Sequence, residues 1–380
     1  MSDAKARFLP GATIGVMGGG QLGRMFAVAA RRMGYKVRIF TPDADSPGGQ
    51  LSDFQTTADF ADEQAVREFA RSVDVLTFEF ENIPFASAQW AAEHAVSRPA
   101  GTILHTTQNR RREKTYLAHA DLPLPRFAVV RDETECAAAI EKLGRPCVVK
   151  SADFGYDGKG QRKVLPGDAV AEVWRPFEGS EAVVEEWVDF VCELSVIVAR
   201  GIDGAISTFP ATRNTHSNHI LDISSVPFGD EKVEHEARQL AMGVADAIDL
   251  RGLLAVEMFY TNDGRLLINE LAPRTHNSGH WTLDACATSQ FEQQVRAVCG
   301  LPLGSTALLS PCAMANLLGE VWAAGEPDWH AAIGGDIKLH LYGKTHARIG
   351  RKMGHLTALA ATAFEAIGKA EKARAVLARL

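Results

Sequence analysis

The first hundred residues alternate short apolar strands with helical stretches, and this alternation limits the fold more than any other feature. Residues 13–17 are apolar and are followed at once by glycines, and residues 22–33 have the pattern of a helix that ends at Gly34. Two further strands, at 36–40 and 73–78, enclose a helical stretch at 63–71. Such alternation predicts an α/β region with a parallel sheet and helices on both faces.

The length and composition predict a globular protein of more than one domain. A chain of 380 residues is too long for one hydrophobic core, and we expect two or three domains. The hydrophobic content of 46% and the charged content of 23% allow a large core without disulfides. The net charge of -7 argues against a nucleic-acid-binding protein but leaves room for a locally basic site that binds an anion.

The cysteines and the apolar runs indicate the cellular compartment of the protein. No run of 18 apolar residues and no signal-peptide pattern is present, so we expect no membrane span and a cytoplasmic protein. The cysteines form no CxxC pair and several lie in apolar runs, which predicts buried free thiols. They are Cys136, Cys147, Cys192, Cys286, Cys299 and Cys312.

Later segments suggest a second and a third unit. A helix is expected over 109–119, and Pro123 and Pro125 then break the chain at a plausible domain edge. Strands are expected at 147–150 and 183–188, followed by a mixed α/β region to about His355 and a surface helix over 358–380. We therefore divide the chain into residues 1–107, 108–188 and 189–380.

A glycine fingerprint follows the first strand. Gly18, Gly20 and Gly23 fit G-x-G-x-x-G, and Asp43 lies about twenty residues further on, as in nicotinamide-binding proteins. The glycines and the free N–H groups of the next helix would equally suit another phosphate or anion. The third interpretation is that these glycines only form a tight turn and bind no ligand.

A second glycine-rich loop has the character of a nucleotide site. Lys150 ends an apolar strand, and residues 155–161 supply three glycines and Lys159 without matching a Walker loop. Such a backbone could fold over phosphates, although an exposed hairpin tip is the alternative. Glu185 and Glu186 lie within the strand at 183–188, where a purine could bind, and Glu193 could reach a ribose.

Two carboxylates are expected to face each other across a hairpin. Asp263-Gly264 is a strong signal for a two-residue turn between the strands at 255–260 and 265–270. Counting outwards from that turn pairs Glu257 with Glu270, whose Cβ atoms would lie roughly 4.5–5.5 Å apart. Mg²⁺ carrying nucleotide phosphates would relieve their repulsion, since magnesium takes one or two protein carboxylates. Strict alternation places Asn269 on the opposite face, and a solvent-facing pair without an ion is the alternative.

Taken together, these motifs resemble the ATP-grasp superfamily over nearly the whole chain. Three stretches, together with residues 20–25, are similar to the 5-(carboxyamino)imidazole ribonucleotide synthases of purine biosynthesis: 155–161, 269–282 and 350–356. The resemblance implies an N-terminal Rossmann-like domain followed by a two-lobed ATP-grasp fold, and a homodimer. It also implies a ligase that uses ATP and Mg²⁺ to convert bicarbonate to carboxyphosphate and to carboxylate the amine of 5-aminoimidazole ribonucleotide.

The same resemblance assigns residues to each ligand. For ATP it implies Arg110, Lys150, Gly155, Tyr156, Asp157, Gly158, Lys159, Gly160, Gln161, Glu185, Glu186, Trp187, Val188, Glu193, His216, Asn269 and Glu270. For magnesium it implies Glu257 and Glu270, with Asn269 beside them. For the ribonucleotide it implies Gln21, Leu22, Glu79 or Glu81, Tyr156, Asp157, Lys159, Lys344, Arg351 and Lys352.

The segment after the second hairpin strand carries the donors that bicarbonate needs. Arg274, His276 and Asn277 place a planar cation and two polar groups directly after a metal ligand, and they are the expected catalytic residues together with Lys352. Thr275 stands where the family often has proline. Three alternatives are a formate-dependent glycinamide ribonucleotide transformylase, a nicotinamide-dependent dehydrogenase and a non-catalytic nucleotide-binding regulator. The dehydrogenase leaves the carboxylate hairpin unexplained, and the regulator would not need both glutamates.

Overall fold

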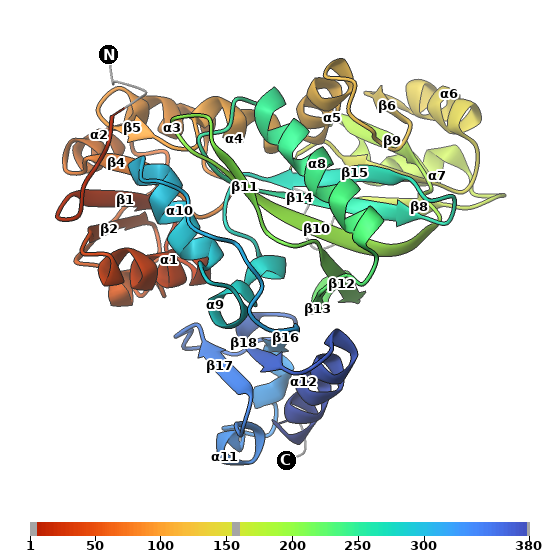
Figure 1. Ribbon diagram of the computed structural model, residues 1–380. Helices are drawn as coiled ribbons and strands as arrows, with labels where there is room; N and C mark the ends of the chain where they lie inside the picture. Colours follow the sequence, from red (N-terminus) through yellow and green to blue (C-terminus); the bar gives the residue numbers. More distant parts are fainter. Residues whose placement is uncertain (1–5, 154–159, 378–380) are drawn as a thin grey trace.

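The computed structural model describes residues 6–153 and 160–377, which form three β-sheets (Figure 1). The N-terminal sheet is parallel, in the order β3-β2-β1-β4-β5. Its strands are β1 (Thr13–Met17), β2 (Lys36–Thr41), β3 (Phe54–Thr57), β4 (Val75–Phe78) and β5 (Val96–Ser97). The predicted parallel sheet is therefore confirmed.

Three helices of this region lie close to their predicted positions: α1 (Gln21–Arg32), α2 (Glu63–Arg71) and α5 (Arg110–His119). Two further helices, α3 (Phe85–Ala92) and α4 (Gly101–Thr107), were not predicted. Asp62 caps α2 and Asn109 caps α5 through side-chain oxygens that accept backbone N–H groups, which explains why both helices begin where they do. A helix from far along the chain, α10 (Gln290–Cys299), packs against α1 and contributes Phe291 and Val295 to the same apolar core.

A small antiparallel sheet follows, in the order β6-β9-β7-β8. It comprises β6 (Phe127–Val130), β7 (Cys147–Ser151), β8 (Gln161–Val164) and β9 (Ala182–Glu186), with helices α6 (Glu133–Leu143) and α7 (Val170–Trp174) packed on it. The strand predicted at 183–188 is therefore displaced, and Trp187 and Val188 lie beyond its end. Of the predicted glycine-rich loop, only Gly160 and Gln161 belong to the described residues.

The third sheet is large and extends into the C-terminal region. Its order is β15-β14-β10-β12-β13-β16-β18-β17, and β11 pairs with β10. Its strands are β10 (Phe190–Arg200), β11 (Ile206–Thr208), β12 (Thr212–Ser217), β13 (Ile220–Val226), β14 (Gly252–Thr261), β15 (Leu266–Ala272), β16 (Cys312–Leu318), β17 (Ile337–Leu341) and β18 (Lys352–Leu359). Its other helices are α8 (Glu231–Ala247), α9 (Thr282–Ala285), α11 (Trp329–Ala332) and α12 (Ala363–Leu377).

The end of the chain differs from the prediction. The surface helix expected from residue 358 begins at Ala363, because residues up to Leu359 complete β18 against β16 and β17. One side of α12 is buried through Ala366, Ala370 and Ala373, so the alanines that suggested an isolated surface helix form its contact with the sheet.

The six cysteines are all buried and free, as predicted. Among residues 6–153 and 160–377, no helix is both long enough and apolar enough to cross a membrane.

Candidate active site

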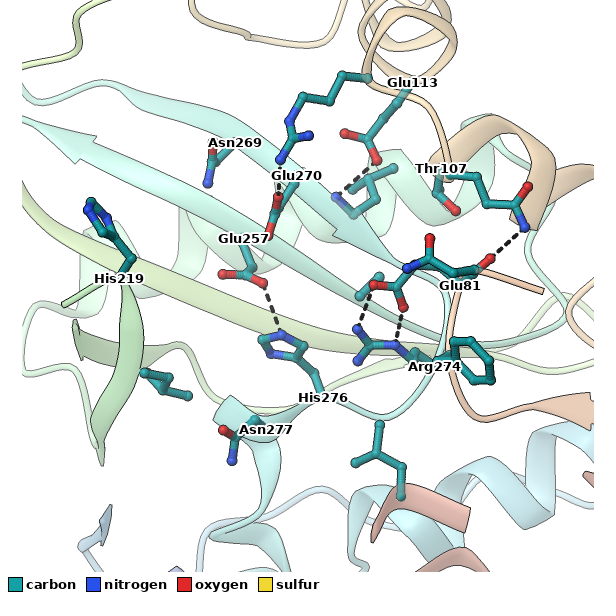
Figure 2. A pocket seen from close by; sticks show the side chains of 18 of the residues that line it. Glu81, Thr107, Glu113, His219, Glu257, Asn269, Glu270, Arg274, His276 and Asn277 are labelled. Carbon is teal, nitrogen blue, oxygen red and sulfur yellow. Dashed lines mark hydrogen bonds and ion pairs between the residues drawn. The ribbon is translucent and has the colours of Figure 1, made fainter. Parts of the chain in front are cut away.

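A cavity of about 1210 Å³ lies where the three sheets meet, and residues from all of them line it. Figure 2 shows part of this lining. Most of the described residues expected to bind a ligand face this one space. They are Gln21, Leu22, Glu79, Glu81, Arg110, Lys150, Gln161, Glu185, Glu186, Trp187, Val188, Glu193, His216, Glu257, Asn269, Glu270, Arg274, His276, Asn277, Lys344, Arg351 and Lys352. Gly160 does not line the cavity, and Gly155, Tyr156, Asp157, Gly158 and Lys159 lie outside the described residues.

The carboxylate hairpin is present, but its turn differs from the prediction. Thr261 pairs with Arg265 through a backbone hydrogen bond of 2.9 Å, so the loop contains three residues instead of two. A β-bulge at Asn269 then shifts the register by one residue and brings Glu257 opposite Glu270. The expected pairing is thus correct although the expected turn is wrong.

The bulge also explains the position of Asn269. Strict alternation would send this side chain to the far face of the sheet, but the inserted residue breaks the alternation. Asn269 and Glu270 consequently both line the cavity, and Figure 2 shows them on the same side as Glu257.

The two glutamates experience different surroundings. Burial would raise the pKa of Glu257, but His276, whose Nε2 lies 3.0 Å from the carboxylate, lowers it to about 2. Enclosure by the cavity walls and the charge of Glu257 raise the pKa of Glu270, while Arg110 lies 4.0 Å from its carboxylate. The pair therefore carries unrelieved repulsion that a cation between the carboxylates would remove.

Two residues that were not predicted from the sequence hold the bulged strand β15 in place. Helix α5 places Glu113 where its carboxyl accepts the backbone N–H of Leu271 at 3.2 Å, and Lys114 where its ammonium donates to the carbonyl of Asn269 at 3.3 Å. Both side chains are buried, and burial raises the pKa of Glu113 to about 8. Because β15 is the edge strand of its sheet, α5 satisfies the backbone groups that this edge would leave open.

The predicted nucleotide residues Lys150 and Glu185 are paired with each other. Lys150 Nζ lies 3.0 Å from Glu185 Oε2, and Lys114 Nζ lies 3.3 Å from Oε1 of the same carboxylate. Burial raises the pKa of Glu185, but the two ammonium groups outweigh it and leave the pKa below its ordinary value. Glu185 thus balances the charge of both lysines at the edge of the cavity.

The remaining residues assigned to adenine and ribose lie along the end of β9 and across β10 and β12. Glu193 pairs with His216, and this contact raises the pKa of the imidazole despite its burial. Trp187 is 43% exposed, and Lys163 lies over its ring at 3.5 Å from the centroid. Glu186 also lines the cavity, and its carboxylate pairs with Arg126.

Arg274 is already held by a carboxylate. Its Nη2 donates to Glu81 Oε1 at 3.0 Å and its Nε donates to the other oxygen, so one edge of the guanidinium is occupied by a bidentate contact (Figure 2). Nη1 donates to the carbonyl of Thr275 at 3.0 Å. Asn277 exchanges two hydrogen bonds with the amide of Asn316, which fixes its orientation at the cavity wall.

Glu79 explains much of the N-terminal glycine fingerprint. Its carboxylate accepts the backbone N–H of Gly20 and, at 3.2 Å, that of Leu22, so it occupies the anion position at the start of α1. A Cβ atom at Gly18 would lie 2.7 Å from the Glu79 side chain, and one at Gly20 would lie 2.4 Å from it. These two glycines therefore admit an internal carboxylate where a dinucleotide phosphate would have to bind.

The sequence does not decide whether Glu79 or Glu81 contacts the ribonucleotide. In the structure the two carboxylates have different environments. Both line the cavity, Glu79 at the N-terminus of α1 and Glu81 beside Arg274. Burial raises the pKa of Glu79, whereas Arg274 outweighs burial and lowers the pKa of Glu81.

A basic cluster of Lys344, Arg351 and Lys352 forms another wall of the cavity, whereas the neighbouring Arg348 does not line it. The ammonium of Lys344 donates to the carbonyl of Lys352 at 2.7 Å. Burial, together with the neighbouring charges of Arg351 and Lys352, lowers the pKa of Lys344 to about 8.

Family models match three consecutive parts of the chain. They describe a ribonucleotide synthetase preATP-grasp domain over residues 11–108, an ATP-grasp domain over residues 115–291 and a phosphoribosylaminoimidazole carboxylase C-terminal domain over residues 312–369. The chain is also 46% identical over 355 residues to the N5-carboxyaminoimidazole ribonucleotide synthase of Bacillus subtilis, with 93% of each chain covered. This chain belongs to the N5-carboxyaminoimidazole ribonucleotide synthase family.

Solved structures of N5-carboxyaminoimidazole ribonucleotide synthases share the whole fold. An ADP complex of one such enzyme superposes with a TM-score of 0.92 at 43% identity and covers 97% of both chains. The Aspergillus clavatus enzyme, solved with ADP and 5-aminoimidazole ribonucleotide, gives a TM-score of 0.89 at 30% identity and covers 98% of this chain and all of that one. The expected fold class, a Rossmann-like parallel sheet followed by an ATP-grasp fold, is confirmed.

Proposed function

We propose that this chain uses ATP to carboxylate 5-aminoimidazole ribonucleotide in purine biosynthesis, with bicarbonate as the carbon source. The γ-phosphoryl group of ATP passes to a bicarbonate oxygen and gives carboxyphosphate and ADP. The exocyclic amine then attacks the carboxyl carbon, or CO₂ released from it, and the products are the N5-carboxyamino ribonucleotide, phosphate and a proton. The observation that carries this proposal is the meeting of the carboxylate pair, the Arg274–Asn277 segment and the basic cluster in one cavity.

The hairpin residues fit a magnesium ion. Glu257, Glu270 and Asn269 present oxygen atoms to the same part of the cavity, and the raised pKa of Glu270 marks repulsion that a divalent ion would relieve. Among the described residues no cluster of three or more acidic, histidine or cysteine side chains is suited to a metal, which agrees with an ion that completes its shell with phosphates and water. When bound, Mg²⁺ would neutralise charge on the transferring phosphoryl group.

The triphosphate would extend from this hairpin toward the small sheet. Arg110 and Lys150 line the route, and Glu193 and His216 lie where a ribose could donate its hydroxyl groups. Gly155, Gly158 and Lys159 belong to this proposal on the strength of the sequence alone.

Bicarbonate would bind between the hairpin and Arg274. His276 and Asn277 face the cavity beside Glu257, so they can orient an oxygen for attack on the γ-phosphate. Because Glu81 accepts two hydrogen bonds along one edge of the Arg274 guanidinium, we infer that Glu81 sets the direction of this cation. Closure around the site would protect carboxyphosphate from water.

The ribonucleotide phosphate would bind to the basic wall. Lys344, Arg351 and Lys352 approach the cavity from the C-terminal strands, while Gln21 and Leu22 line it from the N-terminal domain. The ribose and the amine would then lie between this wall and Arg274. Tyr156, Asp157 and Lys159 are further proposed contacts outside the described residues.

The test is ADP release by the purified protein with magnesium and 5-aminoimidazole ribonucleotide, measured with and without bicarbonate. We expect ADP release to depend on magnesium, 5-aminoimidazole ribonucleotide and bicarbonate. One carboxylated product should form for each ADP released. Matched reactions would contain formate and glycinamide ribonucleotide. Faster ADP release in those reactions than with bicarbonate and 5-aminoimidazole ribonucleotide would contradict the proposal and favour the transformylase.

Three finer expectations accompany this function. We propose domain boundaries near residues 107 and 188, which the change from the parallel sheet to the small sheet and then to the large sheet supports. The resemblance implies a homodimer, which sedimentation of the pure protein would test. The buried free cysteines suit the reducing cytoplasm.

A further inference from the structure

We propose that Asn214, Ser195 and Ser278 are positioning residues that fix which nitrogen of His276 carries a hydrogen. Through them the ring is held with Nδ1 as acceptor and Nε2–H as donor toward Glu257. The catalytic consequence rests on the function proposed above, whereas the hydrogen-bond arrangement itself does not.

The chain of contacts begins behind the imidazole and runs into the large sheet. Ser278 Oγ lies 2.8 Å from His276 Nδ1, and Ser195 Oγ lies 2.7 Å from Ser278 Oγ. Asn214 Nδ2 then lies 2.9 Å from Ser195 Oγ, and the Asn214 carbonyl accepts from Ser224 Oγ at 2.8 Å. Four hydrogen bonds in series therefore connect the cavity wall with the interior of the sheet.

This series of hydrogen bonds from His276 to Ser224 forms a relay that is isolated from water. Ser195, Ser278 and Ser224 are at most 1% exposed and Asn214 is 6% exposed. They come from β10, η3 (Asn277–Gly279), β13 and β12. Polar side chains at such positions are costly unless each finds a partner, and here every member does.

The direction of the relay follows from its donors. An amide nitrogen can only donate, so Ser195 Oγ accepts from Asn214 and must direct its single hydrogen to Ser278. Ser278 Oγ in turn accepts that hydrogen and directs its own to His276 Nδ1.

One further contact selects between the two directions of the relay in the wild-type protein. An asparagine side chain can be turned over, which would reverse every hydroxyl along the path. The backbone N–H of Ser278, however, also donates to His276 Nδ1, at 3.4 Å, and a backbone N–H cannot become an acceptor. Nδ1 therefore carries no hydrogen in the neutral ring, and the hydrogen is on Nε2.

The consequence concerns the role of His276 in the reaction. Its Nε2–H faces Glu257 Oε1 at 3.0 Å at the cavity wall. It can donate to that carboxylate or to an oxygen of bicarbonate or carboxyphosphate. A nitrogen that already carries a hydrogen cannot accept one from the reacting amine, so His276 serves as a donor and not as the general base.

The test measures the tautomer directly in the ligand-free protein. Long-range ¹H–¹⁵N correlation spectra of protein labelled in its histidines distinguish protonated from unprotonated ring nitrogens, and the His276→Gln variant identifies the His276 signals. At about pH 8, above the ordinary imidazole pKa, we expect Nε2–H with unprotonated Nδ1. Nδ1–H in the wild-type protein would overturn the proposal, whatever the enzymatic activity.

The decisive variant is Asn214→Asp, which keeps the shape but removes the amide donor. A carboxylate at 214 can only accept from Ser195, so both serines reverse. The reversed Ser278 hydroxyl then favours the Nδ1–H tautomer of His276 over the one that the long 3.4 Å contact from the Ser278 N–H supports. We expect kcat to fall at least about tenfold while the KM for ATP stays near its wild-type value. A folded Asn214→Asp protein with the wild-type tautomer would refute the relay.

Two further variants distinguish a change in the direction of the hydrogen bonds from a failure to fold. Ser224→Ala is the matched control, because it removes a buried hydroxyl at the far end of the relay without changing its direction, and the tautomer should stay the same. If Asn214→Asp does not fold, Ser195→Ala interrupts the relay and should give a mixture of both tautomers. An unmixed Nε2–H signal in folded Ser195→Ala would count against the proposal.

Discussion

Glu257 and Glu270 face each other across the β14–β15 ladder because a bulge compensates for a turn that is one residue longer than its Asp-Gly sequence predicts. Without the bulge at Asn269, Glu257 would stand opposite Asn269 and the second carboxylate would lie out of register. The bulge also turns Asn269 toward the cavity, so one inserted residue assembles the whole oxygen-rich site.

The two hairpin glutamates should respond differently to the loss of charge. Glu270→Gln relieves the repulsion that raises its pKa, so we expect the Tm of the ligand-free protein to stay the same or rise. Glu257→Gln removes the charged partner of His276 and should lower Tm, at a cost of about 1 kcal/mol. Differential scanning fluorimetry without ligands measures the direction of the change in Tm for both variants.

Turnover should nevertheless fall about 100-fold or more in both variants, because each loses a charged oxygen proposed to hold magnesium. The increase in Tm caused by magnesium and ATP should also disappear. Asp263→Asn is the matched control, since it neutralises an exposed carboxylate in the loop of the same hairpin. Equal loss of activity in Asp263→Asn would point to hairpin folding instead of metal binding.

The sequence predicted those parts of the site that depend on local pattern. The paired glutamates follow from strand alternation around Asp263-Gly264, and the basic wall follows from clustered charges near residue 350. The pairing was nonetheless correct through two compensating departures, the longer turn and the bulge, neither of which has a signal in the residues.

Contacts between distant segments could not be predicted in the same way. Glu113 and Lys114 look like ordinary surface residues of a charged helix, and only the docking of α5 on β15 shows that they hold a strand edge. Glu79 could not be recognised as the internal anion of the glycine loop, because 59 residues separate it from Gly20. The burial of α12 by its alanines likewise depends on tertiary packing.

Arg274→Lys should impair turnover far more than ATP binding. A lysine cannot reproduce the bidentate contact with Glu81, so the cation would lose its fixed direction. We expect kcat to fall on the order of 100-fold, as small displacements of an orienting group commonly do, with the KM for ATP close to wild type. Steady-state kinetics at saturating bicarbonate measure both constants.

Glu81→Gln should reproduce part of this defect, because it leaves Arg274 without its counter-charge. Arg296→Lys is the control, since Arg296 forms a similar pair with Glu292 on α10 away from the cavity, and such surface pairs contribute little. Wild-type kcat in Arg274→Lys would show that bicarbonate is oriented elsewhere.

Lys344 should make ribonucleotide binding weaker at high pH. Its pKa is lowered to about 8, so the ammonium present at pH 7 is lost as the pH rises through that value. A phosphate monoester is already a dianion above its second pKa of about 6, so the substrate charge stays constant over this range. The KM for 5-aminoimidazole ribonucleotide should therefore rise about tenfold between pH 7 and 9.

Lys344→Met should raise that KM at pH 7 toward the value that the wild type reaches near pH 9, and it should remove the dependence on pH. Lys338→Met changes an exposed lysine on the neighbouring strand and should keep the wild-type profile. A profile in Lys344→Met that still rises between pH 7 and 9 would assign the titration to another group.

Glu113 should make the protein less stable as the pH rises from about 4.5 to 8. Burial raises its pKa to about 8, so in this range the folded state keeps a proton that the unfolded state releases. Each pH unit can then cost up to about 1.4 kcal/mol. Glu113→Gln imitates the protonated carboxyl and still accepts the N–H of Leu271, so its Tm relative to wild type should increase steadily between pH 5.5 and 8.

Thermal unfolding of the ligand-free proteins at four pH values measures this difference, with Glu292→Gln as a control in a half-buried pair of α10. Glu113→Ala, in contrast, leaves the Leu271 N–H without its acceptor and should lower Tm at every pH, by the equivalent of about 1–3 kcal/mol. Parallel Tm curves for wild type and Glu113→Gln would show that the carboxyl is ionised throughout and that α5 holds β15 by charge instead of by a neutral hydrogen bond.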